Sequence, residues 1–133
     1  TVNNRTSMFF ASHDKRALVA DEVSMVSGAG YNPARYPNGK YPIGLDHRQI
    51  ITNLCVLDFE GPNHAIRVRS LHPGVTFEEV QENTGFELVR PDNIPTTAAP
   101  TQAQLDIIAK YDPHNLRAYI FKDNPSGVRE KVA

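Results

Sequence analysis

Cysteine occurs once in this chain, at Cys55. A single thiol excludes an internal disulfide and a zinc site built from cysteines. No apolar stretch approaches the roughly 20 residues that span a bilayer. The first ten residues, TVNNRTSMFF, have neither the basic region nor the long apolar run of a secretory signal peptide. We therefore expect no membrane association and a reducing, cytoplasmic environment.

An excess of charge of one sign is also lacking. The chain has 14 Lys and Arg against 15 Asp and Glu, a formal net charge of −1. Nothing in this balance favours nucleic acid or an anionic membrane as a partner. A glycine-rich phosphate loop, a G-x-S-x-G elbow and an HExxH zinc motif are absent as well. With 133 residues, 40% hydrophobic and 22% charged, the composition is that of one globular domain.

The residues that are present predict an α/β chain in which short strands mix with short helices. A long loop, rich in proline and glycine, is expected over residues 31–46, and long loops in compact domains are often functional or cover a sheet edge. The expected strands are residues 7–12, 23–26, 49–57, 65–71 and 86–89.

Two helices are predicted from their capping signals. Thr76 and Glu79 have the spacing of a capping box, and Gly85 is placed to end that helix in a left-handed conformation. Residues 101–104 form a second capping box, and Asp112-Pro113 ends the second helix. A polar tail is expected at the C-terminus.

The stretch 49–57, QIITNLCVL, is nearly continuously apolar, which favours one strand covered on both faces. The turn 61–64 then leads into the alternating strand 65–71, so these two strands predict a hairpin. Cys55 lies inside the apolar strand. We expect it to be a core residue with a raised pKa and little nucleophilicity.

The histidines are scattered, so a metal site would require their convergence in space, and we predict none. His13 stands apart because it follows a buried strand, and ligands of open α/β sheets bind near the carboxyl ends of strands. The alternative is a solvated loop histidine. His72, before Pro73-Gly74, is typical of a turn or packing residue.

Two segments carry a resemblance to a known family. ITNLCVLDFEGP, at 51–62, and LHPGVTFEEVQENTGFELV, at 71–89, resemble the C-terminal half of β subunits in the class I coenzyme A transferase family. The resemblance extends through SHDKRALV at 12–19, VSMVSGAGY at 23–31 and DPHNLRA at 112–118. The loop 31–46 and the SGAGY turn are most similar to the actinobacterial branch of steroid-ring-opening hydrolases; Cys55 departs from the small residue expected there.

The resemblance implies the C-terminal half of an αβα sandwich with a largely parallel sheet plus a hairpin. Residues 1–118 would belong to that domain and 119–133 to a polar tail. It also implies a hetero-oligomer in which the partners are an α subunit and the N-terminal half of the β subunit. The substrate would be a coenzyme A thioester, with no covalently bound cofactor.

In the family's transferases a glutamate attacks the acyl-CoA thioester, passes through an anhydride and becomes a glutamyl-CoA thioester. That glutamate lies in the N-terminal half of the β subunit, and no glutamate of this chain fits its motif. The family's glycine-rich oxyanion loop would end in Thr1, Val2, Asn3 and Asn4. These residues, with His13, are the predicted contacts of the acyl or pantetheine group; an ordinary strand entry is the alternative for residues 1–4.

Three alternatives to coenzyme A transfer stay open. The hydrolase branch uses water to cleave a carbon–carbon bond in a cyclic β-keto acyl-CoA. A second alternative is a non-catalytic scaffold that only completes a sheet and an interface. The third is an N-terminal nucleophile, in which Thr1 acts through its hydroxyl and free amine. Because the chain opens just before a strand, we expect it to be part of a longer polypeptide.

Overall fold

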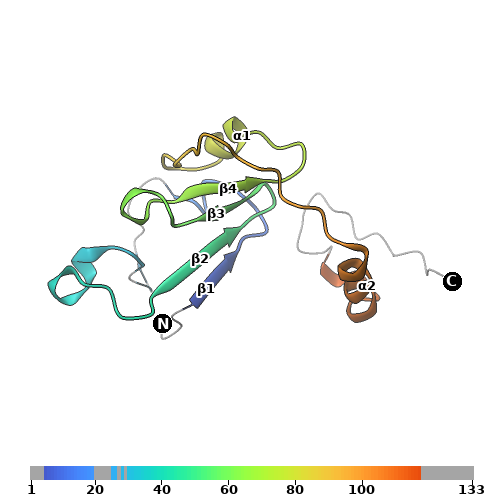
Figure 1. The fold of residues 1–133 in the computed structure, drawn as a ribbon, viewed down its shortest axis with the longest axis horizontal. Coiled ribbons are helices and arrows are strands. Elements are labelled where there is room, and N and C mark those ends of the chain that lie inside the picture. Colours follow the sequence, from blue (N-terminus) through green and yellow to red (C-terminus); the bar gives the residue numbers. More distant parts are fainter. Residues whose placement is uncertain (1–4, 20–24, 27, 29, 118–133) are drawn as a thin grey trace. The chain divides into compact units, whose positions relative to one another are not determined.

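The computed structural model describes residues 5–19, 25–26, 28 and 30–117. The chain forms two compact units, Thr1–Thr97 and Ala98–Ala133. The first unit holds a four-stranded sheet and the short helix α1, and the second holds helix α2 (Figure 1).

The sheet has the order β1-β2-β3-β4. Its strands are β1 (Arg5–Phe9), β2 (Asp46–Ile51), β3 (Cys55–Asp58) and β4 (Arg67–Leu71). β1 pairs with β2 in parallel, whereas β2–β3 and β3–β4 are antiparallel. The predicted α/β class is confirmed, and so is the hairpin formed by β3 and β4.

The single strand predicted over 49–57 is wrong, because the chain turns back within it. The Thr52 hydroxyl accepts hydrogen bonds from the backbone N–H groups of Leu54 and Cys55, both at 3.1 Å. The Thr52 N–H also donates to the Cys55 carbonyl at 3.0 Å. A threonine that satisfies the next amides stabilises a turn. The apolar run is therefore split between β2 and β3, and both halves still pack in the sheet.

The outer edge of β4 is covered by the segment 89–97. Val68 N–H donates to the Val89 carbonyl at 3.1 Å, and Thr97 N–H donates to the Leu71 carbonyl at 2.7 Å. Two isolated parallel bridges result, Arg67 with Val89 and Leu71 with Thr96. The strand predicted over 86–89 is thus reduced to one bridge. Covering an edge in this way leaves fewer unpaired backbone groups for another chain.

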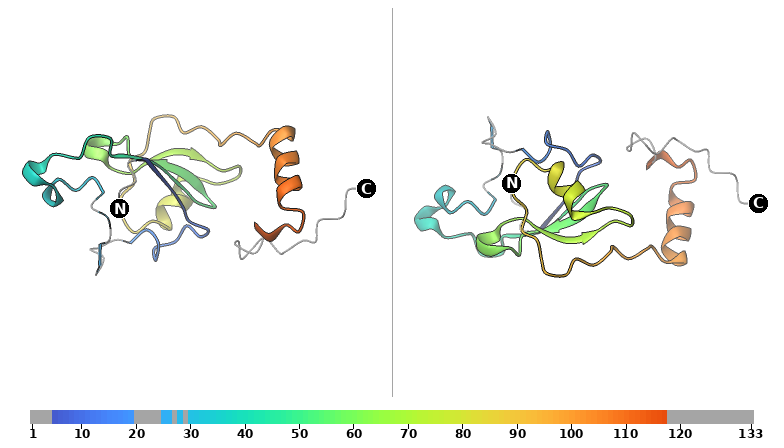
Figure 2. Two further views of the ribbon diagram at one scale, coloured as in Figure 1. Left: turned by 90° about the horizontal axis from the view of Figure 1, so that it is seen from below. Right: turned by 90° about the horizontal axis from the view of Figure 1, so that it is seen from above.

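Helix α1 (Phe77–Glu82) begins at the predicted N-cap, where the Thr76 hydroxyl accepts from Glu79 N–H at 3.2 Å, but only this half of the predicted capping box is formed. Its fully buried Val80 packs into a core with Leu57 and Val68 of the sheet. Figure 2 shows that α1 lies over one side of the sheet.

The left-handed end predicted for this helix at Gly85 is wrong. Gly85 has no positive φ, and its N–H instead donates to the Leu18 carbonyl at 2.8 Å. This bond joins the end of the α1 region to the segment that follows β1.

The loop predicted over 31–46 is confirmed up to Leu45, where it meets β2. It contains two 3-10 turns, Pro33–Arg35 and Pro37–Gly39, and a third turn, Pro62–His64, follows β3. The strand predicted over 23–26 is not seen at Met25 and Val26, which have no regular structure. Val23 and Ser24 lie outside the described residues.

In the second unit, helix α2 spans Gln102–Tyr111 and has the complete predicted capping box between Thr101 and Gln104. It ends before Asp112-Pro113, as predicted. None of its own residues is buried. No helix in the described part of the chain is long and apolar enough to cross a membrane. The boundary predicted at 118/119 falls at the edge of the described residues and stays a prediction.

Candidate functional site

His13 lies at a junction of three chain segments in the first unit. The residue follows β1 in the chain, and its side chain contacts the β2–β3 turn and the residues after α1. Nδ1 is 3.0 Å from the Thr52 hydroxyl and Nε2 is 2.9 Å from the Thr84 hydroxyl. The His13 N–H also donates to the Asn53 side-chain oxygen at 2.7 Å. With only 4% of its surface exposed, His13 is not the solvated loop histidine of the alternative interpretation.

The hydrogen bonds around His13 define its neutral form. The Thr84 hydroxyl donates its one proton to the Val80 carbonyl at 2.8 Å, so it accepts from Nε2–H, and Nδ1 carries the lone pair. The Thr52 hydroxyl has one proton, which it shares between Nδ1 at 3.0 Å and the Cys55 carbonyl at 3.2 Å. Burial lowers the pKa of His13 below 6.5, although the Val80 carbonyl and Asp14 act in the opposite direction. The ring is therefore a neutral connector rather than a cation.

Cys55 faces the same junction, with its sulfur 3.7 Å from His13 Nδ1. Burial raises the pKa of the Cys55 thiol to about 11. This confirms the expected core role, because a protonated, enclosed thiol is a poor nucleophile.

The remaining predicted contacts, Thr1, Val2, Asn3 and Asn4, lie outside the described residues. Their role, and that of His13 toward a substrate, stay predictions. His72 is a packing residue as expected: its ring nitrogens lie 3.0 Å from the Thr97 hydroxyl and 2.9 Å from the Thr52 carbonyl.

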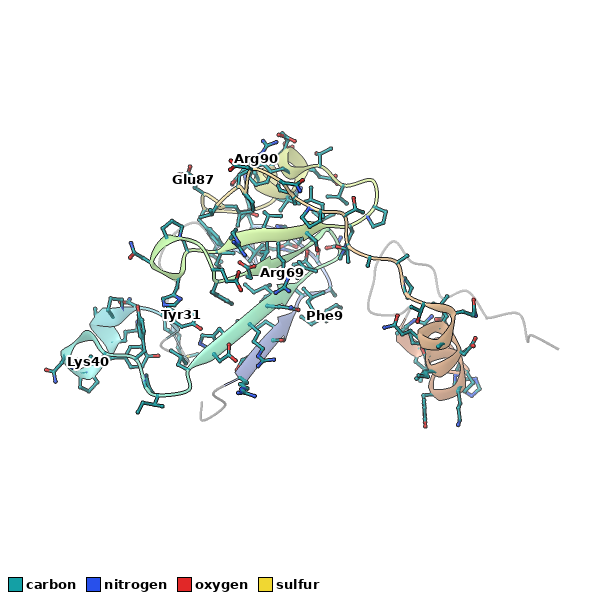
Figure 3. All side chains as sticks on the ribbon, viewed as in Figure 1. Phe9, Tyr31, Lys40, Arg69, Glu87 and Arg90 are labelled. Atoms are coloured by element: carbon teal, nitrogen blue, oxygen red, sulfur yellow. The ribbon has the colours of Figure 1, made fainter. Side chains whose placement is uncertain are left out.

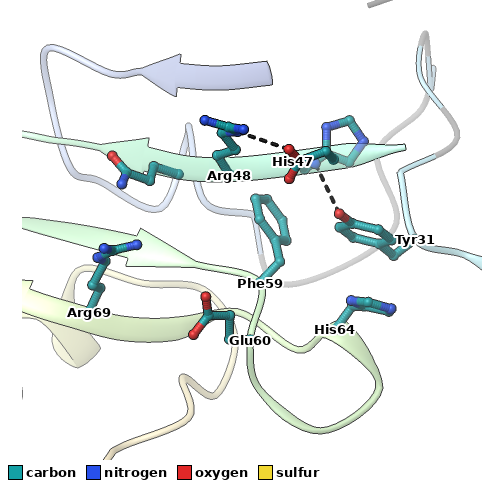
Figure 4. A pocket seen from close by; sticks show the side chains of 9 residues that line it. Tyr31, His47, Arg48, Phe59, Glu60, His64 and Arg69 are labelled. Atoms are coloured by element: carbon teal, nitrogen blue, oxygen red, sulfur yellow. Dashed lines mark hydrogen bonds and ion pairs between the residues drawn. The ribbon is translucent and has the colours of Figure 1, made fainter. Parts of the chain in front are cut away.

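A pocket of about 500 Å³ opens at another part of this unit (Figure 4). It combines residues of the long loop, of β2 and β4, and of the segment after β3, and we call it the Tyr31 pocket. Figure 3 shows Tyr31 and Arg69 in the sheet region, away from Arg90 beside α1. The lining residues are Tyr31, Asp46, His47, Arg48, Gln49, Phe59, Glu60, His64 and Arg69.

Tyr31 organises the aromatic wall of this pocket. Its hydroxyl accepts a hydrogen bond from His47 N–H at 2.9 Å, which fixes the loop against the start of β2. Its ring stacks on His64 with centroids 4.1 Å apart and meets Phe59 at 5.6 Å. Tyr41 donates to the Tyr31 carbonyl at 2.8 Å. The loop is thereby held in a defined shape.

The turn after β3 brings His64 to Tyr31. Gly61 allows this turn because an added Cβ would lie 2.5 Å from the Ala65 carbonyl oxygen. Asn63 and His64 both adopt the left-handed region, with φ of 54° and 62°. Such a conformation is uncommon for a residue with a side chain and costs about 1 kcal/mol or more. Backbone strain of this kind is often found at functional sites.

His47 contributes a second unusual feature. Its Nδ1 atom is buried and has no hydrogen-bond partner among the described residues. Buried polar atoms are nearly always paired, so an unpaired nitrogen at the edge of a pocket is a candidate contact for a ligand or water.

Within the described residues, no group of three or more His, Cys, Asp or Glu side chains could hold a metal ion. Sequence reasoning did not find the Tyr31 pocket, although it singled out the long loop as functional or edge-covering. The available signal was a series of tyrosines at 31, 36 and 41 followed by the Gly61–His64 turn.

Comparison with known proteins finds relatives among subunits of a ring-cleaving hydrolase and of a CoA-transferase. No protein-family model matches it. It is 40% identical over 118 residues to the cholesterol ring-cleaving hydrolase IpdB subunit of Rhodococcus jostii RHA1, and equally to that of Mycobacterium tuberculosis H37Rv. It is 37% identical over 81 residues to a subunit of the 3-oxoadipate CoA-transferase of Pseudomonas knackmussii.

These matches cover 88% of this chain for the hydrolase subunits and 61% for the transferase subunit, but 46% and 29% of the relatives. The chain thus spans about half or less of the length of the curated relatives it matches.

Two solved structures share the fold of this chain. IpdAB of Rhodococcus jostii RHA1 superposes with a TM-score of 0.74 at 37% identity, covering 88% of this chain and 47% of that chain. Glutaconate coenzyme A-transferase of Acidaminococcus fermentans, at 22% identity, has a TM-score of 0.64 over 80% of this chain and 41% of its own, and supports the fold alone.

Proposed function

Because this chain belongs to the β-subunit family of the class I coenzyme A transferases, we propose that it is part of an acyl-CoA-processing enzyme assembled with an α subunit. The observation that carries this proposal is the 40% identity over 118 residues to a ring-cleaving hydrolase subunit, together with the same fold. The substrate is a coenzyme A thioester, and the enzyme acts in the cytoplasm as a hetero-oligomer.

Two chemistries are compatible with this family. The first is transfer of coenzyme A from an acyl-CoA to a carboxylic acid, supported by the likeness to the 3-oxoadipate CoA-transferase. The second is hydrolytic opening of a ring in a cyclic β-keto acyl-CoA. The larger matched share, 88% against 61% of this chain, supports the hydrolase.

Within this enzyme, the chain's role is to complete the domain and to shape the substrate side of the site. Thr1, Val2, Asn3, Asn4 and His13 remain its proposed contacts with the acyl or pantetheine group. The His13 junction supports such a role for the segment after β1, because it fixes that segment to the β2–β3 turn through the 2.7 Å bond to Asn53.

The test is activity of the assembled enzyme. The complex is incubated with an acyl-CoA and a carboxylate acceptor, and separately with a cyclic β-keto acyl-CoA. Formation of a new acyl-CoA from the acceptor supports transfer, whereas a ring-opened acyl-CoA product supports the hydrolase. An assembly inactive on both classes, yet folded and complete by mass, contradicts the proposal and favours a non-catalytic scaffold.

A further inference from the structure

We propose that the Tyr31 pocket is an oxyanion-binding site in which Arg69 is the cationic contact. The ligand group is a phosphate or a carboxylate attached to a larger molecule. Its source rests on the proposed function: it is either a phosphate of coenzyme A or the carboxylate of an acyl group.

The first support is a contrast among the arginines of the sheet. Arg5 and Arg48 both pair with Asp46, at 3.7 and 2.9 Å. Arg67 pairs with Asp58 at 2.7 Å and with Glu60. In the described part of the chain, Arg69 alone among these strand arginines has no carboxylate partner. An unpaired guanidinium beside a pocket presents its donor fork to an incoming oxyanion.

The second support is the charge state of the pocket. Two carboxylates line it, and both are ion-paired: Asp46 with Arg48, and Glu60 with Arg67, which it shares with Asp58. They therefore oppose a bound anion less than two free carboxylates would. Arg48 and Arg69 balance Asp46 and Glu60 on the lining, and Arg69 is the cation among them without an ion-pair partner in the described residues; the Gln49 amide offers N–H donors on the same lining.

The third support is the rigid aromatic wall. Figure 4 shows the Phe59 ring between Arg48 and Glu60, with Arg69 reaching from β4 toward the same pocket. Tyr31, held by its bond from His47 N–H and by its stack on His64, closes the other end. A wall that is fixed before binding reduces the entropy lost on association. It suits an anion carried on a flat or apolar body.

The experiment measures binding of two probes to the full chain within the assembled enzyme, by isothermal titration. Adenosine 3′,5′-bisphosphate represents the phosphate source, and glutarate represents the carboxylate source. The variants are Arg69→Gln, Arg69→Lys and the matched control Arg90→Gln. The control removes the same charge from a surface arginine that pairs with Glu78 outside the pocket.

We expect one probe to bind and Arg69→Gln to weaken it roughly 10- to 100-fold, the usual effect of losing a charge-assisted hydrogen bond. The affinity of Arg69→Lys should lie between those of the unaltered enzyme and Arg69→Gln, because lysine keeps the charge but not the two-pronged donor geometry of the guanidinium. Arg90→Gln should bind as the unaltered enzyme does. The probe that binds identifies the source of the anion.

Equal affinities of Arg69→Gln and Arg90→Gln for both probes overturn the site, and so does the absence of binding to the unaltered enzyme. If Arg69→Gln fails to fold, Gln49→Leu provides the second variant, and an unchanged affinity there overturns the site. If the proposed function fails but the site is real, probe binding still depends on Arg69 while the enzyme turns over no acyl-CoA. Turnover with no effect of Arg69→Gln on binding removes the oxyanion site alone.

Discussion

The first unit holds histidines in two contrasting environments, the His13 junction and the Tyr31 pocket. At the His13 junction, both ring nitrogens lie within 3.0 Å of threonine hydroxyls, and the residue is 4% exposed. In the Tyr31 pocket, one buried histidine nitrogen has no partner in the described residues, another histidine is exposed and strained, and an arginine lacks a counter-ion.

The hydrogen bonds of the His13 junction stabilise the fold, whereas the Tyr31 pocket has groups that are free to bind a ligand. A buried polar group that is fully hydrogen-bonded fixes the chain around it, so its removal weakens the fold. Groups that keep unused donors at an open pocket contribute little to folding but can bind. The comparison therefore predicts large stability effects at the junction and small ones at the pocket.

The largest effect is expected from His13→Ala. The change leaves a cavity in the core and removes one hydrogen bond from each of two buried hydroxyls, so the free energy of unfolding should fall by about 3–4 kcal/mol. Urea unfolding of the full chain, followed by far-UV circular dichroism, measures this. A loss below about 1 kcal/mol would show that the junction does not hold the unit together.

The second prediction compares the loss of stability at two arginines on β4. Arg67 is paired with Asp58, whose side chain is 1% exposed, whereas Arg69 has no such partner. Arg67→Gln should cost about 2–3 kcal/mol because it leaves a buried carboxylate without its cation. Arg69→Gln should change stability by less than about 0.5 kcal/mol.

The same unfolding experiment compares these two arginine variants directly, since each loses one charge from the same strand. Equal losses in both would mean that the ion pair with Asp58 adds nothing to the stability of the unit.

Prediction from sequence succeeded where the signal was local. The capping box of α2 and the N-cap of α1 depend on residues three apart, and both were found. The β2–β3 turn was missed although Thr52-Asn53 is a turn sequence, because the apolar residues on either side outweighed it. Side-chain bonding to the backbone, not hydrophobicity, decides the chain path at that point.

The candidate site was harder because it depends on distant segments. His13 was singled out, but its partners lie 39 and 71 residues further along the chain. Tyr31 and His64 likewise meet only after β2 and β3 have paired. Periodicity reports which face of a strand is buried, and it carries no information on which loops converge.

A smaller effect is expected from pH. Because burial lowers the pKa of His13 in the folded chain, the unfolded chain binds more protons between the lowered pKa and 6.5. The contribution of His13 to stability is thus fully present above pH 6.5 and is lost as pH falls through the lowered value. Unfolding midpoints between pH 5 and 8 should show this loss, and His13→Asn should abolish that part of the pH dependence while His64→Gly keeps it.

The smallest effect is expected from His64→Gly. The variant loses the stack on Tyr31, worth about 0.5–1.5 kcal/mol. It also relieves the left-handed strain at φ 62°, worth about 1 kcal/mol, so stability should change by less than about 1 kcal/mol. The pocket itself should change: the chain has five tyrosines and no tryptophan, so loosening of Tyr31 should reduce its near-UV circular dichroism. A large loss of stability with an unchanged tyrosine spectrum would place His64 with His13 as a structural residue and remove the distinction between the two regions.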